Sequence, residues 1–169
     1  MKPVHIEDKP SFTVIGKLGQ GPASEGAKWV PALWEEANQN FKEIKDLAQT
    51  DEAGNIVGIW GAMSDISESF ARWGEEGKYL AGCEVVDGSE APAGWTKWFI
   101  PSYRYAVIPC DQSNYQDKFN YMIDEFLPHN NYTLAGAVHE FYNPAEANGE
   151  LYLYFPIEKN SRELILASS

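Results

Sequence analysis

Basic residues are scarce in this sequence of 169 residues, in which 13 Lys and Arg stand against 25 Asp and Glu and give a net charge of -12. Binding to a nucleic-acid backbone needs clustered basic residues that neutralise phosphates. The sequence contains no such cluster, so we expect no direct nucleic-acid binding. The acidity favours the attraction of small cations, although an acidic surface that serves only solubility explains it equally well.

Long apolar runs are also missing. No segment approaches the roughly 20 consecutive apolar residues that span a bilayer. Residues 1–12 lack the apolar stretch of a signal peptide. We therefore expect a cytoplasmic protein that does not bind membranes.

Cysteine and histidine are too few for a disulfide framework or a metal centre. Cys83 and Cys110 each lie in an apolar run, which predicts buried free thiols. The three histidines, His5, His129 and His139, do not have the spacing of metal ligands. No glycine-containing segment has the pattern of a phosphate or dinucleotide loop, so we expect neither a metal nor a cofactor.

Apolar residues make up 44% of the sequence and aromatic residues 14%, which is typical of a folded domain with a substantial core. We expect one domain over residues 1–169. The hydrophobic patterns predict the order strand, helix, strand, strand twice, in a first repeat at about 10–87 and a second at about 96–159. The segments are 10–18, 25–48, 55–63 and 78–86, then 104–110, 113–127, 133–143 and 150–158.

This order predicts an α+β fold. The two repeats would join into one antiparallel sheet, with two helices on one side and a ligand groove between the halves. Similarity between the residues of the two halves is faint, so the order of elements carries the prediction.

Glu140 stands out within the strand predicted at 133–143. Read with a period of two, it shares a face with Leu134, Gly136, Val138 and Tyr142, where an apolar residue is expected. Burial of an acid is unfavourable unless a partner compensates it. Glu140 is therefore either a locally satisfied structural group, such as an edge-strand acid beside a lysine, or the charge with which a pocket holds a cation.

Other residues are candidates to line the same groove, with core packing as the alternative for each. Glu84 is a second acid in phase with apolar neighbours in its strand. Trp34 and Phe41 are expected to pack the first helix onto the sheet. The aromatic candidates on predicted strands are Trp60, Trp98, Tyr105, Tyr142 and Tyr152.

Several segments resemble a known family over most of the chain. They are VPALWEE (30–36), YLAGCEV (79–85), WFIPSYRYAVIPC (98–110), FLPHNNYTLAG (126–136), HEFYNP (139–144) and LYLYFPIEK (151–159). In order and spacing they are similar to the GyrI-like small-molecule-binding domain, also called the AraC-type effector-binding domain. The resemblance implies an aromatic cavity for lipophilic, often cationic, molecules, and its binding acid matches Glu140.

The resemblance also sets the functional alternatives. The leading one is a stand-alone effector-binding protein. Because residues 1–9 leave no room for a helix-turn-helix, we expect any role in transcription or drug sequestration to act through a partner, such as a separate DNA-binding regulator. A second is a hydrolase of strained-ring electrophiles, with Glu140 as acid or base and Tyr142 or Tyr105 as proton partner. A third is a protein-contact module like the gyrase inhibitors of this family.

Overall fold

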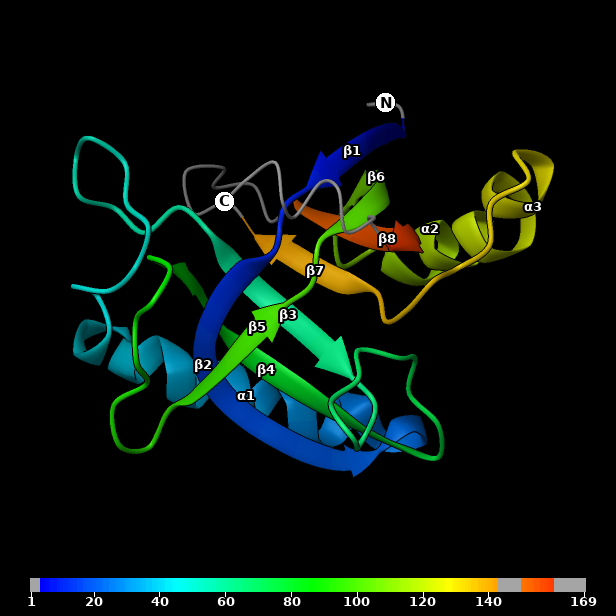
Figure 1. Cartoon of the computed structure of the whole chain (residues 1–169). Helices are drawn as coiled ribbons and strands as arrows, with labels where there is room; N and C mark the ends of the chain where they lie inside the picture. The colour runs from blue at the N-terminus through cyan, green and yellow to red at the C-terminus, as the bar shows by residue number, and fades with distance from the viewer. Residues whose placement is uncertain (1–3, 143–149, 160–169) are drawn as a thin grey trace.

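The computed structural model describes residues 4–142 and 150–159. Eight strands form one antiparallel sheet in the order β1-β6-β8-β7-β3-β4-β2-β5 (Figure 1). The strands are β1 (His5–Lys9), β2 (Phe12–Pro22), β3 (Ile59–Ser64), β4 (Glu76–Val85), β5 (Thr96–Ile100), β6 (Tyr103–Cys110), β7 (His139–Tyr142) and β8 (Leu151–Lys159). The helices are α1 (Gly26–Asn40), α2 (Tyr115–Tyr121) and α3 (Leu127–His129), and a π-helical turn, Met122–Phe126, joins the last two.

The fold is the predicted α+β arrangement with a duplicated topology. The first half runs β2, α1, β3, β4, and the second runs β6, α2 to α3, β7, β8. Pairing of β3 with β7 joins the two halves. Strand β1, which precedes the first half, pairs with β6 of the second, and β5, which precedes the second half, pairs with β2 of the first. Each half therefore receives one additional strand from the segment that precedes the other.

Both helical segments cover the same face of the sheet. In α1, Ala37 packs with Ala81 of β4, and Met122 of the π-helical turn packs with Leu153 of β8. Ala81 and Leu153 are aligned with Glu140 by the strand register, so they lie on its face. In Figure 1, α1 runs along one half of the sheet and α2 and α3 lie beside the other half. The helices therefore leave Glu140 on the covered side.

The opposite face carries an aromatic core. Rings from distant strands meet there, for example Trp60 with Phe12 at a centroid distance of 5.0 Å and with Tyr154 at 4.9 Å. The buried members of this far-face cluster are Phe12, Val14, Trp60, Ala62, Phe70, Leu80, Trp98, Ile100, Tyr103, Tyr105, Val107 and Tyr154. This cluster holds much of the aromatic content seen in the sequence.

The predicted helix at 25–48 is too long at its C-terminal end. Helix α1 ends at Asn40, whose side-chain amide donates to the carbonyl of Glu36 at 2.8 Å, and a 3-10 turn follows. Ile44 and Ala48 are buried as their spacing predicts, but Ala48 forms a β-bridge with Val85. Pairing with the edge of the sheet thus replaces the last helical turns.

The strand predicted at 133–143 is also shorter in the structure. Within the described residues, ladder pairing begins only at His139. Before it, the backbone amide of Ala135 donates to the carbonyl of Pro156, and that of Ala137 donates to the carbonyl of Phe70. These hydrogen bonds to a loop and to one strand residue satisfy the backbone without a regular ladder. Residue 143 of the predicted strand lies outside the described residues.

Candidate functional site

A cavity of about 710 Å³ lies on the helix-covered face, between α1 and the start of α2. Elements of both halves line it, as the predicted groove requires. Within residues 4–142 and 150–159, no Lys, Arg or His lines it. The lining residues are Gly26, Ala27, Val30, Pro31, Trp34, Met63, Trp73, Tyr79, Gln112, Tyr115, Gln116, Glu140 and Tyr142.

Of the described acids, only Glu140 lines this cavity, and its side chain is nearly inaccessible, with 8% of the residue exposed. Three tyrosine hydroxyls donate to its carboxylate. Tyr79 donates to Oε1 and Tyr115 to Oε2, both at 2.5 Å, and Tyr142 donates to Oε1 at 3.1 Å. Hydrogen bonds to a charged acceptor are short and strong, so these donors favour the ionised form of Glu140.

Trp34 fixes the direction in which the Tyr79 hydroxyl donates its hydrogen bond. The indole Nε1–H of Trp34, which can only donate, lies 2.8 Å from the Tyr79 oxygen. The Tyr79 oxygen therefore accepts from Trp34, and its own proton points to Glu140. Helix α1 and strand β4 thus cooperate to hold one donor in place on the carboxylate.

Two opposing effects act on the ionisation of Glu140. Burial raises its pKa above the ordinary value of 4.5, and the hydrogen bonds from Tyr115, Tyr79 and Tyr142 counteract that rise. In turn, burial and the nearby carboxylate raise the pKa of each tyrosine, so the three phenols remain protonated donors. The site therefore holds a buried carboxyl group in a ring of neutral donors, and the pKa of this carboxyl lies above its ordinary value.

Aromatic faces form much of the remaining wall. Trp73 is held by stacking on Trp29 at a centroid distance of 5.4 Å and by donation from its Nε1 to the carbonyl of Lys78. Trp34 packs edge to face on Tyr142 at 5.3 Å. Such a combination of a buried carboxylate and aromatic rings attracts organic cations, because the charge acts in a medium of low dielectric constant and the rings add cation–π contact.

Comparison with known proteins assigns the family. The chain matches the Cass2 family, described as integron-associated effector binding protein, over residues 5–157. The chain belongs to this family. No curated protein sequence matches it.

Three solved structures share the fold of this Cass2 family member. SAV2435 bound to tetraphenylphosphonium is 15% identical, with a TM-score of 0.68 over 93% of this chain and 94% of that chain. The integron cassette protein VCH_CASS2, from the mobile metagenome of Vibrio cholerae, is 12% identical, with a TM-score of 0.63 over 92% and 95%. The C-terminal domain of EcmrR is 14% identical, with a TM-score of 0.62 over 94% and 98%. The GyrI-like fold expected from the sequence is thereby confirmed.

Of the seven residues predicted to bind ligand, the structure brings two together at this cavity, Glu140 and Tyr142. The other five lie on the opposite face of the sheet. The register explains this, because Trp60 pairs with Phe141, the neighbour of Glu140 whose side chain points the other way. By the same alternation, Glu84, Trp98, Tyr105 and Tyr152 share the face of Trp60.

Glu84 has partners of its own on that far face. Its Oε1 accepts from the indole of Trp60 at 3.2 Å and pairs with the ammonium of Lys9 at 3.4 Å. The Lys9 ammonium also lies 4.2 Å from the ring centroid of Phe12. A cation of the chain itself therefore occupies the position beside Glu84, which agrees with the structural alternative stated for this acid.

The remaining aromatic candidates pack into the far-face cluster. The indole of Trp98 donates to Glu68 at 3.1 Å, and Tyr152 packs on Phe141 at a centroid distance of 6.2 Å. The hydroxyl of Tyr105 is buried without a hydrogen-bond partner among the described residues. Of the two proton partners considered for a hydrolase, only Tyr142 lies beside Glu140. The ligand-binding roles of the five far-face residues remain predictions.

Sequence reasoning did not assign Tyr79, Tyr115, Trp34 or Trp73 to the site. Tyr79 carried a weak signal, because it alternates with Leu80 and so lies on the face opposite to Glu84. Nothing in the sequence shows which of these two faces the helices cover. The packing expected of Trp34 against the sheet is present, through Tyr79 and Tyr142, and this residue also lines the cavity.

Three further observations concern only the described residues. Cys83 and Cys110 are buried and free, and burial raises the pKa of each thiol to about 12, so neither is an activated nucleophile. Within the described ranges, no three His, Cys, Asp or Glu side chains are grouped as metal ligands would be. In the same part of the chain, no helix has the length and apolar character needed to cross a bilayer.

Proposed function

We propose that this protein is an effector-binding domain that holds a lipophilic aromatic cation in the cavity beside Glu140. One observation carries the proposal. The carboxylate of Glu140 is buried, accepts three tyrosine hydroxyls, and shares its cavity with no basic side chain of the described residues. A buried acid with a purely structural role is expected to pair with a lysine or arginine. No described basic side chain pairs with Glu140, so a cationic ligand can bind beside it.

The chemistry of the walls supports a lipophilic ligand. Flat aromatic surfaces from Trp34, Trp73 and Tyr142 offer dispersion and cation–π contact and require few directional hydrogen bonds. A cavity of 710 Å³ lies within the range that holds drug-sized molecules. The structural similarity to SAV2435, whose structure contains tetraphenylphosphonium, is consistent with this class of ligand.

The biological role we propose is sensing or sequestration of such a cation, with a partner protein as the reader of the bound state. The net charge of -12 disfavours direct contact with DNA. A related domain forms the C-terminal part of EcmrR, a protein whose structure is described in complex with DNA. For this protein, we propose that a separate regulator supplies the DNA contacts.

The test is a titration with tetraphenylphosphonium followed by tryptophan fluorescence, on the wild type, Glu140→Gln and Glu84→Gln. Glutamine keeps the shape of the side chain and removes its charge. We expect saturable binding that is at least tenfold weaker in Glu140→Gln, or about 1.4 kcal/mol. Glu84→Gln is the matched control, because its acid lies on the far face, and it should bind as the wild type does. Equal affinity of wild type and Glu140→Gln would overturn the proposal.

A further inference from the structure

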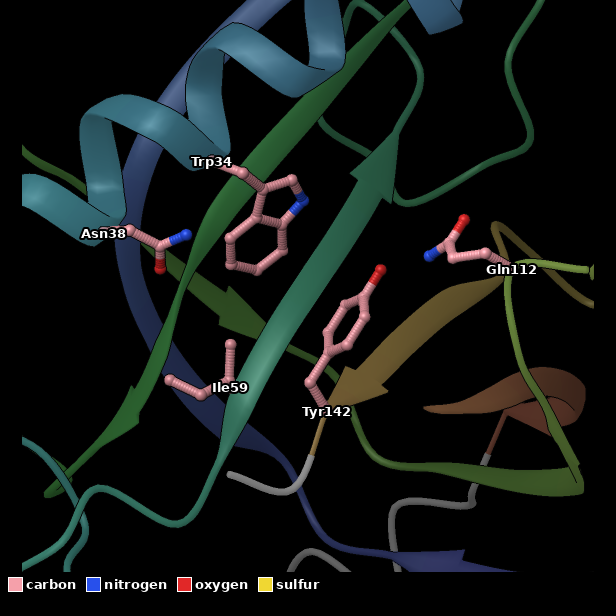
Figure 2. Close-up of a pocket in the computed structure, with 5 residues that line it drawn as sticks. All are labelled: Trp34, Asn38, Ile59, Gln112 and Tyr142. Carbon is pink, nitrogen blue, oxygen red and sulfur yellow. The ribbon is translucent and has the colours of Figure 1, made fainter. Parts of the chain in front are cut away.

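A second cavity, of about 360 Å³, adjoins the Glu140 cavity. Figure 2 shows its five lining residues, which come from α1, β3, β7 and the segment after β6. Trp34, Gln112 and Tyr142 line both cavities, whereas Asn38 and Ile59 line only the smaller one. The two spaces are therefore neighbours that share a wall made chiefly of two aromatic rings.

The two rings of this wall are held unequally. Trp34 and Tyr142 meet edge to face, with an interplanar angle of 73°. Trp34 is anchored by its indole donor on Tyr79 at 2.8 Å. Tyr142 is half-buried, and its hydrogen bond to Glu140, at 3.1 Å, is the longest of the three that the carboxylate accepts. Displacement of Tyr142 would leave Glu140 with its two short hydrogen bonds, so Tyr142 is the less firmly held of the two rings.

The chemistry of the smaller cavity differs from that of the larger one. Among the residues that the structure describes, its lining contains two side-chain amides and no charged residue. In Figure 2, Asn38 and Gln112 extend toward the Trp34–Tyr142 wall from opposite sides. Both side chains are exposed, and the structure shows no hydrogen bond from either amide to another described residue. The described lining thus offers donors and acceptors to a neutral polar group, and it contains no acid that could compensate a second cation.

We propose that the two cavities form one site in two parts for an elongated aromatic monocation. The charged aromatic head lies beside Glu140, and a neutral arm that carries an amide or ether group passes Tyr142 and reaches Asn38 and Gln112. This inference rests on the proposed function and narrows the class of ligand. A second positive charge on the arm would be placed where no described lining residue compensates it, so a neutral arm is favoured.

The experiment compares three probes with the same triphenylphosphonium head. One has a methyl group as its fourth substituent, one a chain that ends in a primary amide, and one a chain of equal length that ends in trimethylammonium. Calorimetry on the wild type should show the amide probe binding at least fivefold tighter than the methyl probe. The trimethylammonium probe should also be compared with the methyl probe, and its increase in affinity should be smaller than that of the amide probe.

Two variants of α1 locate the arm. Asn38→Leu removes the amide at an exposed position, where the substitution is compatible with folding. It should lower the ratio of amide-probe to methyl-probe affinity, because only the Gln112 amide remains for the arm. Gln39→Leu, the adjacent exposed amide that lines neither cavity, is the matched control and should keep the wild-type ratio.

The outcomes separate this inference from the function on which it rests. If the methyl probe binds and the amide arm adds nothing in the wild type, the two-part site is wrong and the cation site stands. Retention of the full gain in Asn38→Leu would also overturn the inference. If none of the three triphenylphosphonium probes binds to the wild type, both the proposed function and the two-part site are wrong.

Discussion

The hydroxyl of Tyr79 donates to Oε1 of Glu140 at 2.5 Å, although strand β3 lies between β4 and β7, the strands that carry the two residues. Gly61 of β3 makes this contact possible. It pairs with Glu140 on one side and with Ala81 on the other. A Cβ at position 61 would overlap the Tyr79 hydroxyl and would lie 2.7 Å from Oε1. The absence of a side chain on β3 therefore opens the space in which tyrosine and glutamate meet.

Gly61→Ala should disrupt this contact and weaken cation binding. Because Tyr79 is only 1% exposed, its ring cannot move aside freely, and the hydrogen bond to Glu140 is lost or the strands shift. We expect the Kd for tetraphenylphosphonium to rise about tenfold, and urea titration to show a loss of about 1–3 kcal/mol in the free energy of unfolding. Gly74→Ala is the control, because a Cβ there meets nothing within 4 Å. Wild-type affinity in Gly61→Ala would contradict the role given to the glycine.

Trp34→Phe should weaken binding and reduce the fluorescence response. Phenylalanine keeps a ring in the wall but cannot donate to the Tyr79 hydroxyl. Trp34 and Trp73 are the two tryptophans that line the cavity, so loss of Trp34 should remove a large share of the ligand-induced quenching. We expect a Kd about three to tenfold higher by calorimetry.

Trp98→Phe provides the comparison for this variant, since Trp98 lies in the far-face cluster. It should retain both the affinity and most of the quenching. If Trp98→Phe lost the response and Trp34→Phe kept it, the ligand would lie on the far face, and the far-face aromatic residues predicted from the sequence would become the binding residues.

The alternation of residues in a strand predicted the unusual position of Glu140 but could not assign its neighbours. A period of two shows that Glu140 and Tyr142 share a face, and that Glu84 shares one with Leu80. It does not show which face the helices cover, because that depends on how distant segments pack. The sequence therefore predicts Trp60 and Glu84 in one groove with Glu140, whereas in the structure they lie on the opposite face of the sheet.

The fold itself was accessible from local patterns, because the order of strands and helices repeats and each element has a clear hydrophobic period. The residues of the site were harder to predict from the sequence. Tyr79 reaches Glu140 only through the registers of β3 with β4 and with β7, which are long-range pairings. The end of α1 at Asn40 was missed for a similar reason, since Ala48 keeps a helical spacing but pairs with Val85.

Cation affinity should rise with pH. Burial raises the pKa of Glu140 above 4.5, so the carboxyl becomes the attracting anion only as the pH passes that raised value. The groups that face it, Tyr79, Tyr115, Tyr142 and Cys110, have raised pKa values and stay neutral in this range. Calorimetry from pH 4.5 to about pH 8 should show a falling Kd and release of a proton on binding. Glu140→Gln should show neither effect, and a flat wild-type profile would contradict the prediction.

The raised pKa of Glu140 has the opposite consequence for stability. Its contribution to the free energy of unfolding of the protein without ligand should fall as the pH rises. A folded-state pKa above the unfolded value means that the folded state binds the proton more tightly. The contribution of Glu140 to the free energy of unfolding is therefore fully present below pH 4.5 and is lost as the pH rises through the folded-state pKa. Wild type should lose stability relative to Glu140→Gln across this window, as measured by urea titration at each pH. If the difference in stability between the wild type and Glu140→Gln stayed constant with pH, Glu140 would have the same pKa in the folded and unfolded states.

His139 should produce the reverse trend. Its ring is 1% exposed, and its Nδ1 accepts the backbone N–H of Met63 at 3.1 Å, which requires a neutral imidazole. Burial lowers its pKa from 6.5 to about 4. A depressed pKa in the folded state gives stability that is present above pH 6.5 and is lost as the pH falls toward 4. The size of this loss is about 3 kcal/mol.

His139→Asn isolates this contribution, because the asparagine Oδ1 can accept the Met63 amide and does not titrate. The stability of the wild type relative to His139→Asn should decline between pH 6.5 and pH 4, in urea titrations at fixed protein concentration. His129→Asn, at an exposed position at the end of α3, should follow the wild-type curve. If His139→Asn also followed it, the imidazole would be charged in the folded protein, and the hydrogen bond from Met63 would have to be replaced at low pH.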